Sequence, residues 1–309
     1  KDKDVLFEYF LDWAFVHCFY YTEKHFDKGI KFALKAMGCA QNDEQLFRAV
    51  TRAMWLHLYV GDLKGALSFF SKADNLFAET RDIYARKEFY FGASWLFLEK
   101  GVFDKSYQYA LEGIKLDEGS KNANVGLYLY SFKAICEHEF EQHEKAIKTI
   151  NYALEKEKKV FGGEISLAGG ELLQVKANVL LSLQKIPEAE QSVSESLKIF
   201  EKLKGKEPYH ATALSKRIFS QILLMANKPE EAKIHCIRSL EMYKKLNTEY
   251  SYDSVETMVL MGKIHLELLE YEELNSLFKK MESNLGLDNE HTSKLFNAVA
   301  ASDKLWAIV

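Results

Sequence analysis

The residues best suited to hold a metal ion in this 309-residue chain lie between positions 136 and 143. Cys136, His138 and His143 are close in sequence, and glutamates separate them. Zinc uses such ligands, but two histidines on one helix share a face only when they are four residues apart. His138 and His143 are five apart and span an expected turn. We therefore interpret the segment as a polar turn between helices and predict no metal site.

Other candidates for catalysis also have simpler explanations. His235 and Cys236 are adjacent, so on a helix their side chains point in different directions. The pairs Gly162-Gly163 and Gly169-Gly170 lack the Gly-Lys-Ser/Thr that follows a phosphate-binding loop. The pair Glu230-Glu231 begins an expected helix, where carboxylates complement the helix dipole. We predict no catalytic residue and no cofactor, so the chain is not expected to be an enzyme.

Composition narrows the class of partner. Hydrophobic residues make up 48% of the chain and charged residues 28%, which is typical of a folded, soluble protein. The net charge is −4 with both signs interspersed, which gives no basic stripe for nucleic acid. No apolar run reaches the length that spans a bilayer, so we expect no membrane insertion.

The four cysteines lie far apart and form no Cys-x-x-Cys pair. In a chain of this length we interpret them as reduced, mostly buried thiols of a reducing compartment. The expected location is the cytoplasm, either of the cell that makes the protein or of another cell into which it is secreted. The chain begins at Lys1 rather than at Met, which suggests a piece of a longer protein.

An internal repeat organises the chain. In Gly61-Asp-Leu-Lys-Gly-Ala66, a turn glycine precedes a small residue by five positions, and Phe70 and Ala73 follow at steps of four and three. The phrase recurs with weaker copies at both ends, and its anchor residues are Gly29, Ala66, Ser106, Ala146, Ala189, Ala232 and Leu274. Small residues at these places predict close contact between the two helices of each repeat.

The residues between the anchors favour helices joined by short turns. The chain has only three prolines and 16 glycines, too few for many loops or strands. Apolar residues recur at steps of three and four, as helices require. Leu173, Ala177, Leu180 and Leu181 give this pattern in one first helix, and Ile234, Ile237 and Leu240 give it in a second helix.

This pattern resembles the tetratricopeptide repeat, a pair of antiparallel helices stacked into a right-handed superhelix. The repeats of this chain are longer than the family's 34 residues, and from Gly205 to Met281 they are closer to the variety in kinesin light chains. The resemblance implies one all-α solenoid of about seven helix pairs over residues 1–309. The expected repeats are 10–45, 46–85, 86–126, 127–161, 170–206, 210–250 and 253–287, followed by a capping helix over 289–307.

The resemblance also implies a binding groove lined by the first helix of each repeat. Its middle position falls on Cys18, Trp55, Trp95, Ile135, Asn178, Gln221 and Lys263, and its flanking positions include Arg48, Arg52, Tyr59, Gln174 and Arg217. Amides and guanidinium groups suit the backbone of an extended peptide, and Arg and Trp are common at binding hot spots. We therefore predict an aromatic N-terminal half and a polar C-terminal half. Alternatively, the tryptophans fill the core between repeats.

Two functions compete for this architecture. The leading prediction is a scaffold or adaptor that binds a protein, peptide or helix without chemistry. The alternative is a ligand- or peptide-sensing arm of a larger bacterial-type signalling regulator or multidomain ATPase. Residues 1–160 hold 30 of the 41 aromatic residues, which leaves either a larger core or a surface for self-association.

Overall fold

The computed structural model describes residues 2–19, 26–117, 124–163, 166–246, 248–249 and 251–285, together with residues 293 and 297. All regular structure in these ranges is helical, which confirms the predicted all-α class. The chain divides into two compact units, Lys1–Leu183 and Gln184–Val309, and each is described by itself. The prediction of one solenoid over 1–309 stays a prediction. The expected capping helix over 289–307 lies outside the described residues, apart from positions 293 and 297.

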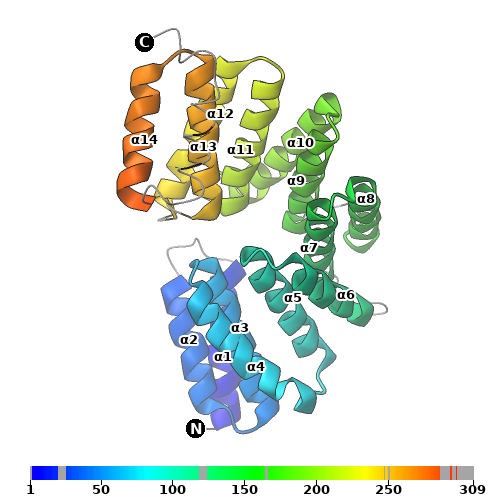
Figure 1. Cartoon of the computed structure of the whole chain (residues 1–309). Helices are drawn as coiled ribbons and strands as arrows, with labels where there is room; N and C mark the ends of the chain where they lie inside the picture. Colours follow the sequence, from blue (N-terminus) through cyan, green and yellow to red (C-terminus); the bar gives the residue numbers. More distant parts are fainter. Residues whose placement is uncertain are drawn as a thin grey trace. The chain divides into compact units, whose positions relative to one another are not determined.

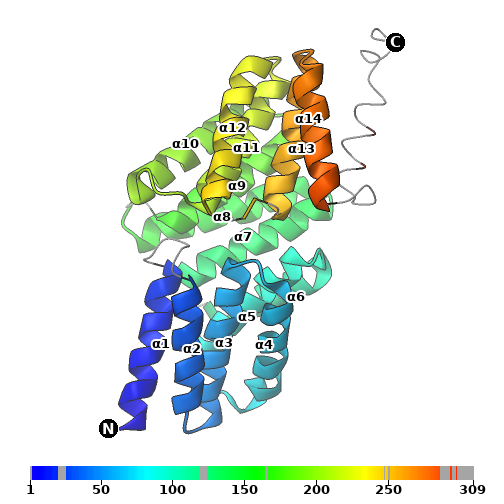
Figure 2. The same cartoon turned by 90° about the vertical axis from the view of Figure 1, so that its left-hand side faces the viewer.

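Consecutive helices within each unit lie side by side and reverse direction (Figures 1 and 2). Unit 1 contains α1 (Lys3–Phe19), α2 (Phe26–Cys39), α3 (Asp43–Tyr59), α4 (Leu63–Leu76), α5 (Ile83–Glu99), α6 (Phe103–Asp117), α7 (Asn124–Glu139), α8 (His143–Val160) and α9 (Leu167–Ser182). Unit 2 contains α10 (Ile186–Lys204), α11 (His210–Met225), α12 (Pro229–Lys245), α13 (Tyr252–Glu267) and α14 (Tyr271–Leu285). The expected repeat bounds stay a prediction. The boundary between the units falls inside the fifth expected repeat, 170–206.

The turn from first to second helix has one backbone geometry throughout the described residues. A residue with positive φ follows the first helix at Gly61, Gly101, Glu141, Gln184, Asn227 and Leu269, five positions before each of the six anchors from Ala66 to Leu274. At the first of these, the N–H of Asp62 donates to the carbonyl of His57 at 2.9 Å. The residue with positive φ and this long backbone bond together form a Schellman motif, which ends one helix and directs the chain into the next.

The anchors are buried, as the repeat predicts. Ala66, Ser106, Ala146, Ala189 and Ala232 have no exposed surface. At Gly29 an added methyl group would lie 2.7 Å from a Leu56 methyl carbon, so the site has no room for a side chain. The small residues therefore permit the close helix contacts that the sequence predicted.

The isoleucines whose spacing indicated a helix at α12 do not lie on its buried face. Ile234 and Ile237 on α12 are 50% and 41% exposed, whereas Ala232, Cys236, Ser239 and Tyr243 face the interior. The steps of three and four that start from the anchor define the buried face. Ile234 lies two residues after Ala232, and Ile237 lies two residues before Ser239. This offset places both isoleucines on the opposite side of the helix.

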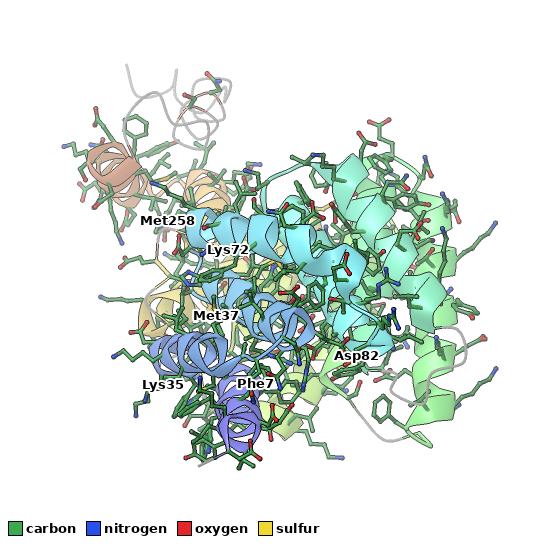
Figure 3. All side chains as sticks on the ribbon, turned by 90° about the horizontal axis from the view of Figure 1, so that it is seen from below. Phe7, Lys35, Met37, Lys72, Asp82 and Met258 are labelled. Carbon is green, nitrogen blue, oxygen red and sulfur yellow. The ribbon has the colours of Figure 1, made fainter. Side chains whose placement is uncertain are left out.

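Aromatic side chains fill much of unit 1. Its largest core cluster includes Phe47, Trp55, Phe89 and Phe97. A smaller cluster holds Phe7 of α1, and Met37 of α2 packs against it (Figure 3). Among the described helices, none is long and apolar enough to cross a membrane.

Candidate functional site

The first helices form the layer that carries every predicted contact residue. In unit 1, α1 contacts α3, α3 contacts α5, α5 contacts α7 and α7 contacts α9; in unit 2, α11 contacts α13. Side chains on the surface of this layer are called the first-helix face of each unit. Unit 1 holds Arg48, Arg52, Trp55, Tyr59, Trp95, Gln174 and Asn178, and unit 2 holds Arg217, Gln221 and Lys263.

Trp55 belongs to the core of unit 1, which corrects the prediction that it lines a groove. Its side chain is 0% exposed, its Nε1–H donates to the carbonyl of Glu88 at 3.0 Å, and its ring meets the edge of Phe91. A methyl group on Gly92 of α5 would come within 2.6 Å of the Trp55 nitrogen. The indole therefore joins two successive first helices and has no surface for a partner.

Arg52 is also buried, and its charge is already paired. Its Nη2 lies 2.6 Å from Glu88 Oε1, and its guanidinium lies between the rings of Phe15 and Trp55. Burial, followed by the charge of Glu88, raises the pKa of Tyr84 to about 12, so this phenol stays protonated beside the carboxylate. Although Nε and Nη1 of Arg52 have no hydrogen-bond acceptor, only 4% of the residue is exposed. A partner therefore has no path to it in this conformation.

Arg48 lies nearer the surface and has a strong partner of its own. Its guanidinium makes two hydrogen bonds to the Glu8 carboxylate, at 2.7 and 3.0 Å, in the fork geometry that arginine favours. It borders an open depression of about 500 Å³ with Arg81 on the same rim. The other lining residues are acidic or amides, namely Asn42, Asp43, Glu44, Gln45 and Glu79.

Tyr59 and Trp95 are the predicted aromatic contacts that reach the surface. Both are partly exposed, and their rings meet edge to face at 4.8 Å. Nε1 of Trp95 donates to Glu99 at 3.0 Å. Further along unit 1, Gln174 of α9 is buried, whereas Asn178, one turn on, is partly exposed. Of the amide pair in unit 1, only Asn178 is therefore open to a partner.

Unit 2 presents a different arrangement around Arg217. Its Nη2 is 3.9 Å from Asp253 Oδ1 of α13, too far for a hydrogen bond, and its Nε is buried without an acceptor. His210 Nε2 lies 3.5 Å from the other oxygen of the same carboxylate. The Arg217 side chain remains 17% exposed, although its Nε is buried. A guanidinium donates to a carboxylate or to a peptide carbonyl.

Gln221 lies one turn after Arg217 on α11 and is partly exposed. An amide at this spacing shares a face with the guanidinium, and it offers both a donor and an acceptor. Lys263 of α13 is exposed. Sequence reasoning missed Asp253 and His210, because their proximity to Arg217 depends on how α11 and α13 pack.

Two of the thiols, Cys136 and Cys236, are not suited to nucleophilic chemistry. Burial raises the pKa of Cys136 to about 11 and that of Cys236 to about 12, so both stay protonated at neutral pH. Among the described residues, no group of three or more histidines, cysteines or carboxylates is placed to hold a metal ion. The arrangement of the first-helix faces is suited to non-covalent binding.

Comparison with known proteins gives structural relatives only. No family model matches the chain, and no curated protein matches it. A Rap protein complexed with Competence and Sporulation Factor has a TM-score of 0.69 at 9% identity, covering 96% of this chain and 77% of that one. NprR in complex with its cognate peptide NprX has a TM-score of 0.67 at 15% identity, covering 100% and 85%.

A third structure is a signal transduction ATPase with numerous domains from Pyrococcus horikoshii, which carries a tetratricopeptide repeat sensor. Its TM-score is 0.55 at 15% identity, and the match covers 89% of this chain and 40% of that one. The structural similarity establishes the fold, but at sequence identities this low it does not establish the function.

Proposed function

We propose that this chain, which has the fold of tetratricopeptide-repeat proteins, is a non-enzymatic scaffold or adaptor that binds a peptide or a helix on its first-helix face. The observation that carries the proposal is Arg217, a partly exposed arginine whose Nη2 lies 3.9 Å from the Asp253 carboxylate and makes no hydrogen bond to it. A ligand carboxylate or carbonyl can therefore accept from this guanidinium without displacing a strong internal partner.

Unit 2 is the principal contact surface in this proposal. Arg217 binds a carboxylate or backbone carbonyl of the ligand, and Gln221 pairs with the ligand backbone one turn further along α11. Lys263 adds a positive charge from α13. The preferred ligand is therefore an extended or helical segment that carries at least one acidic residue or a free C-terminus.

On unit 1, considered by itself, the partly exposed predicted contacts are Tyr59, Trp95 and Asn178, with Arg48 at the rim of its depression. The proposal omits Arg52, Trp55 and Gln174, because they are buried. Aromatic rings at the surface favour apolar side chains of a ligand.

The test starts from a library of displayed 12-residue peptides selected on the purified chain. The tightest peptide is synthesised, and its affinity is measured by titration calorimetry. Changing Arg217→Met or Gln221→Ala should weaken binding at least tenfold, since each removes a ligand contact that nothing else replaces. The matched control is Arg238→Met, which removes an exposed arginine from α12. Equal affinities for the Arg217 and Arg238 variants would refute the proposed face.

A second candidate is a sensor that changes shape when it binds a ligand. The NprR and Rap structures, each solved with a bound factor or peptide, and the sensor of the Pyrococcus ATPase favour it. Small-angle scattering with and without the selected peptide separates the two functions. A sensor should become more compact on binding, and a scaffold should keep the same radius of gyration.

A further inference from the structure

The turn between α7 and α8 brings two imidazole rings together. His138 lies in the last turn of α7 and His143 is the first residue of α8, and their Nδ1 atoms are 3.0 Å apart. The chain reverses at Glu141, which has a φ of 60°. The N–H of Glu141 donates to the carbonyl of His138 at 2.9 Å, which closes the turn between the two helices.

Two other turns provide a direct comparison. His57 faces Asp62 at 2.8 Å, and His265 faces Glu270 at 2.7 Å, each across the same five-residue spacing. In both, the imidazole meets a carboxylate, which completes an ion pair or a hydrogen bond. Of these three turns, only the α7–α8 turn has a second imidazole in the position of the carboxylate. Two facing ring nitrogens either share one proton or together bind a cation.

The distance between the rings fits the second option, because two nitrogens at about 2.0 Å from one ion are about 2.8 Å apart at a right angle and about 3.3 Å apart in a tetrahedron. The observed 3.0 Å lies between these values.

Space for the remaining ligands lies beside His143. It borders an open depression of about 480 Å³ that also contains Glu141, Gln142 and Glu144. Lys145 and Lys148 are on the same rim, but the Lys145 ammonium is held by the Tyr107 hydroxyl and the Gln142 side chain. The described residues supply no third fixed ligand. Water or a mobile carboxylate would therefore complete the coordination.

We propose that His138 and His143 form a two-histidine site for a borderline divalent metal ion such as Cu²⁺ or Zn²⁺, which joins the end of α7 to the start of α8. Imidazole nitrogen is a preferred ligand of these ions, and a right-angled pair favours Cu²⁺. The site is separate from the first-helix face and does not depend on peptide binding.

The test is titration calorimetry of the tag-free chain with CuCl₂ and with ZnCl₂ at pH 7.5 in a buffer that does not chelate. One equivalent should bind with a dissociation constant on the order of micromolar. Changing His143→Gln should weaken this binding at least tenfold, as loss of one ligand of two requires. The matched controls are His57→Gln and His265→Gln, which alter the corresponding turns and should leave the affinity unchanged.

Either of two results would overturn the site: saturable binding that survives the His143 change, or equal losses in the His265 control. Circular dichroism of each variant without metal verifies that it is folded. If His143→Gln does not fold, nitrogen-15 spectra of the wild-type imidazoles decide the question. Zn²⁺ should shift the Nδ1 resonances of two histidines, and a spectrum that does not change rules the site out.

Discussion

The first-helix faces of the two units use arginine in opposite ways. In unit 1, Arg48 lies 2.7 Å from Glu8 and Arg52 lies 2.6 Å from Glu88, so each has a close carboxylate partner within the unit. In unit 2, Arg217 approaches Asp253 only to 3.9 Å and makes no hydrogen bond to it. An arginine with a close carboxylate partner supports the stacking of helices. One without such a partner, at a partly exposed position, is available to a ligand.

The largest expected effect is a difference in unfolding free energy between variants of Arg52 and of Arg217. Arg52→Met keeps an apolar chain between Phe15 and Trp55 but leaves the Glu88 carboxylate buried without its cation. Such a loss costs about 3–5 kcal/mol of unfolding free energy. Arg217→Met should cost less than about 1 kcal/mol, since the ion pair it breaks is long and partly exposed. Urea denaturation followed by circular dichroism measures both.

A double variant sharpens the assignment. Adding Glu88→Gln to Arg52→Met removes the unpaired charge and should restore part of the lost stability. If the double variant is no more stable than Arg52→Met alone, the cost comes from lost packing around the guanidinium rather than from the charge. If the Arg52→Met and Arg217→Met variants lose similar amounts of unfolding free energy, the proposed difference between the two faces is wrong.

The next largest expected effect is the loss of stability in Gly92→Ala, which tests how tightly unit 1 is packed. In Gly92→Ala the added methyl would lie 2.3 Å from Met54 Cε and 2.6 Å from Trp55 Nε1. The Trp55 indole must move and its hydrogen bond to Glu88 must weaken, which should cost about 1–3 kcal/mol. Gly38→Ala on α2 is the matched control, because nothing lies within 4 Å of its added methyl. Thermal unfolding should distinguish them, and equal melting temperatures would contradict the close packing.

The smallest expected effect is the loss of folding stability at low pH. One histidine in each unit, His138 in unit 1 and His235 in unit 2, should account for part of it. Burial lowers the pKa of His138 in unit 1, as does His143, and burial lowers that of His235 in unit 2, as do Lys216 and Arg238. The unfolded chain therefore binds more protons than the folded one as pH falls below about 6.5, and stability decreases there. Changing His138→Gln or His235→Gln should flatten the dependence of melting temperature on pH between 7 and 5. An unchanged slope in both variants would show that other groups control it.

The repeat and its packing could be predicted from the sequence, because a small residue in a close contact leaves a direct signature. Gly29, Ala66 and Ala232 mark the buried face of their helices without any knowledge of the neighbours. The groove could be predicted only in part. Trp55 and Tyr59 are one turn apart on α3, yet the first is enclosed by α5 and the second reaches the surface. Helical spacing alone does not say where the seam between two first helices lies.

The paired histidines show a different limit. A spacing of five is unfavourable for a shared site on one helix, and the turn expected between His138 and His143 gave no reason to place the rings together. The structure has this turn at Glu141, and the reversal brings the two Nδ1 atoms to 3.0 Å from each other. The turn could be expected from the sequence, but the closeness of the rings depends on its backbone geometry.

The concentration of aromatic side chains in unit 1 also gives the protein a built-in optical probe. Of its four tryptophans, Trp13, Trp55 and Trp95 belong to the described part of unit 1, and Trp306 lies outside the described residues. In a Trp306→Phe variant, all indole fluorescence would come from unit 1, where Trp55 is shielded from water and should emit at shorter wavelength. Emission would then follow the unfolding of unit 1 alone, while circular dichroism follows both units.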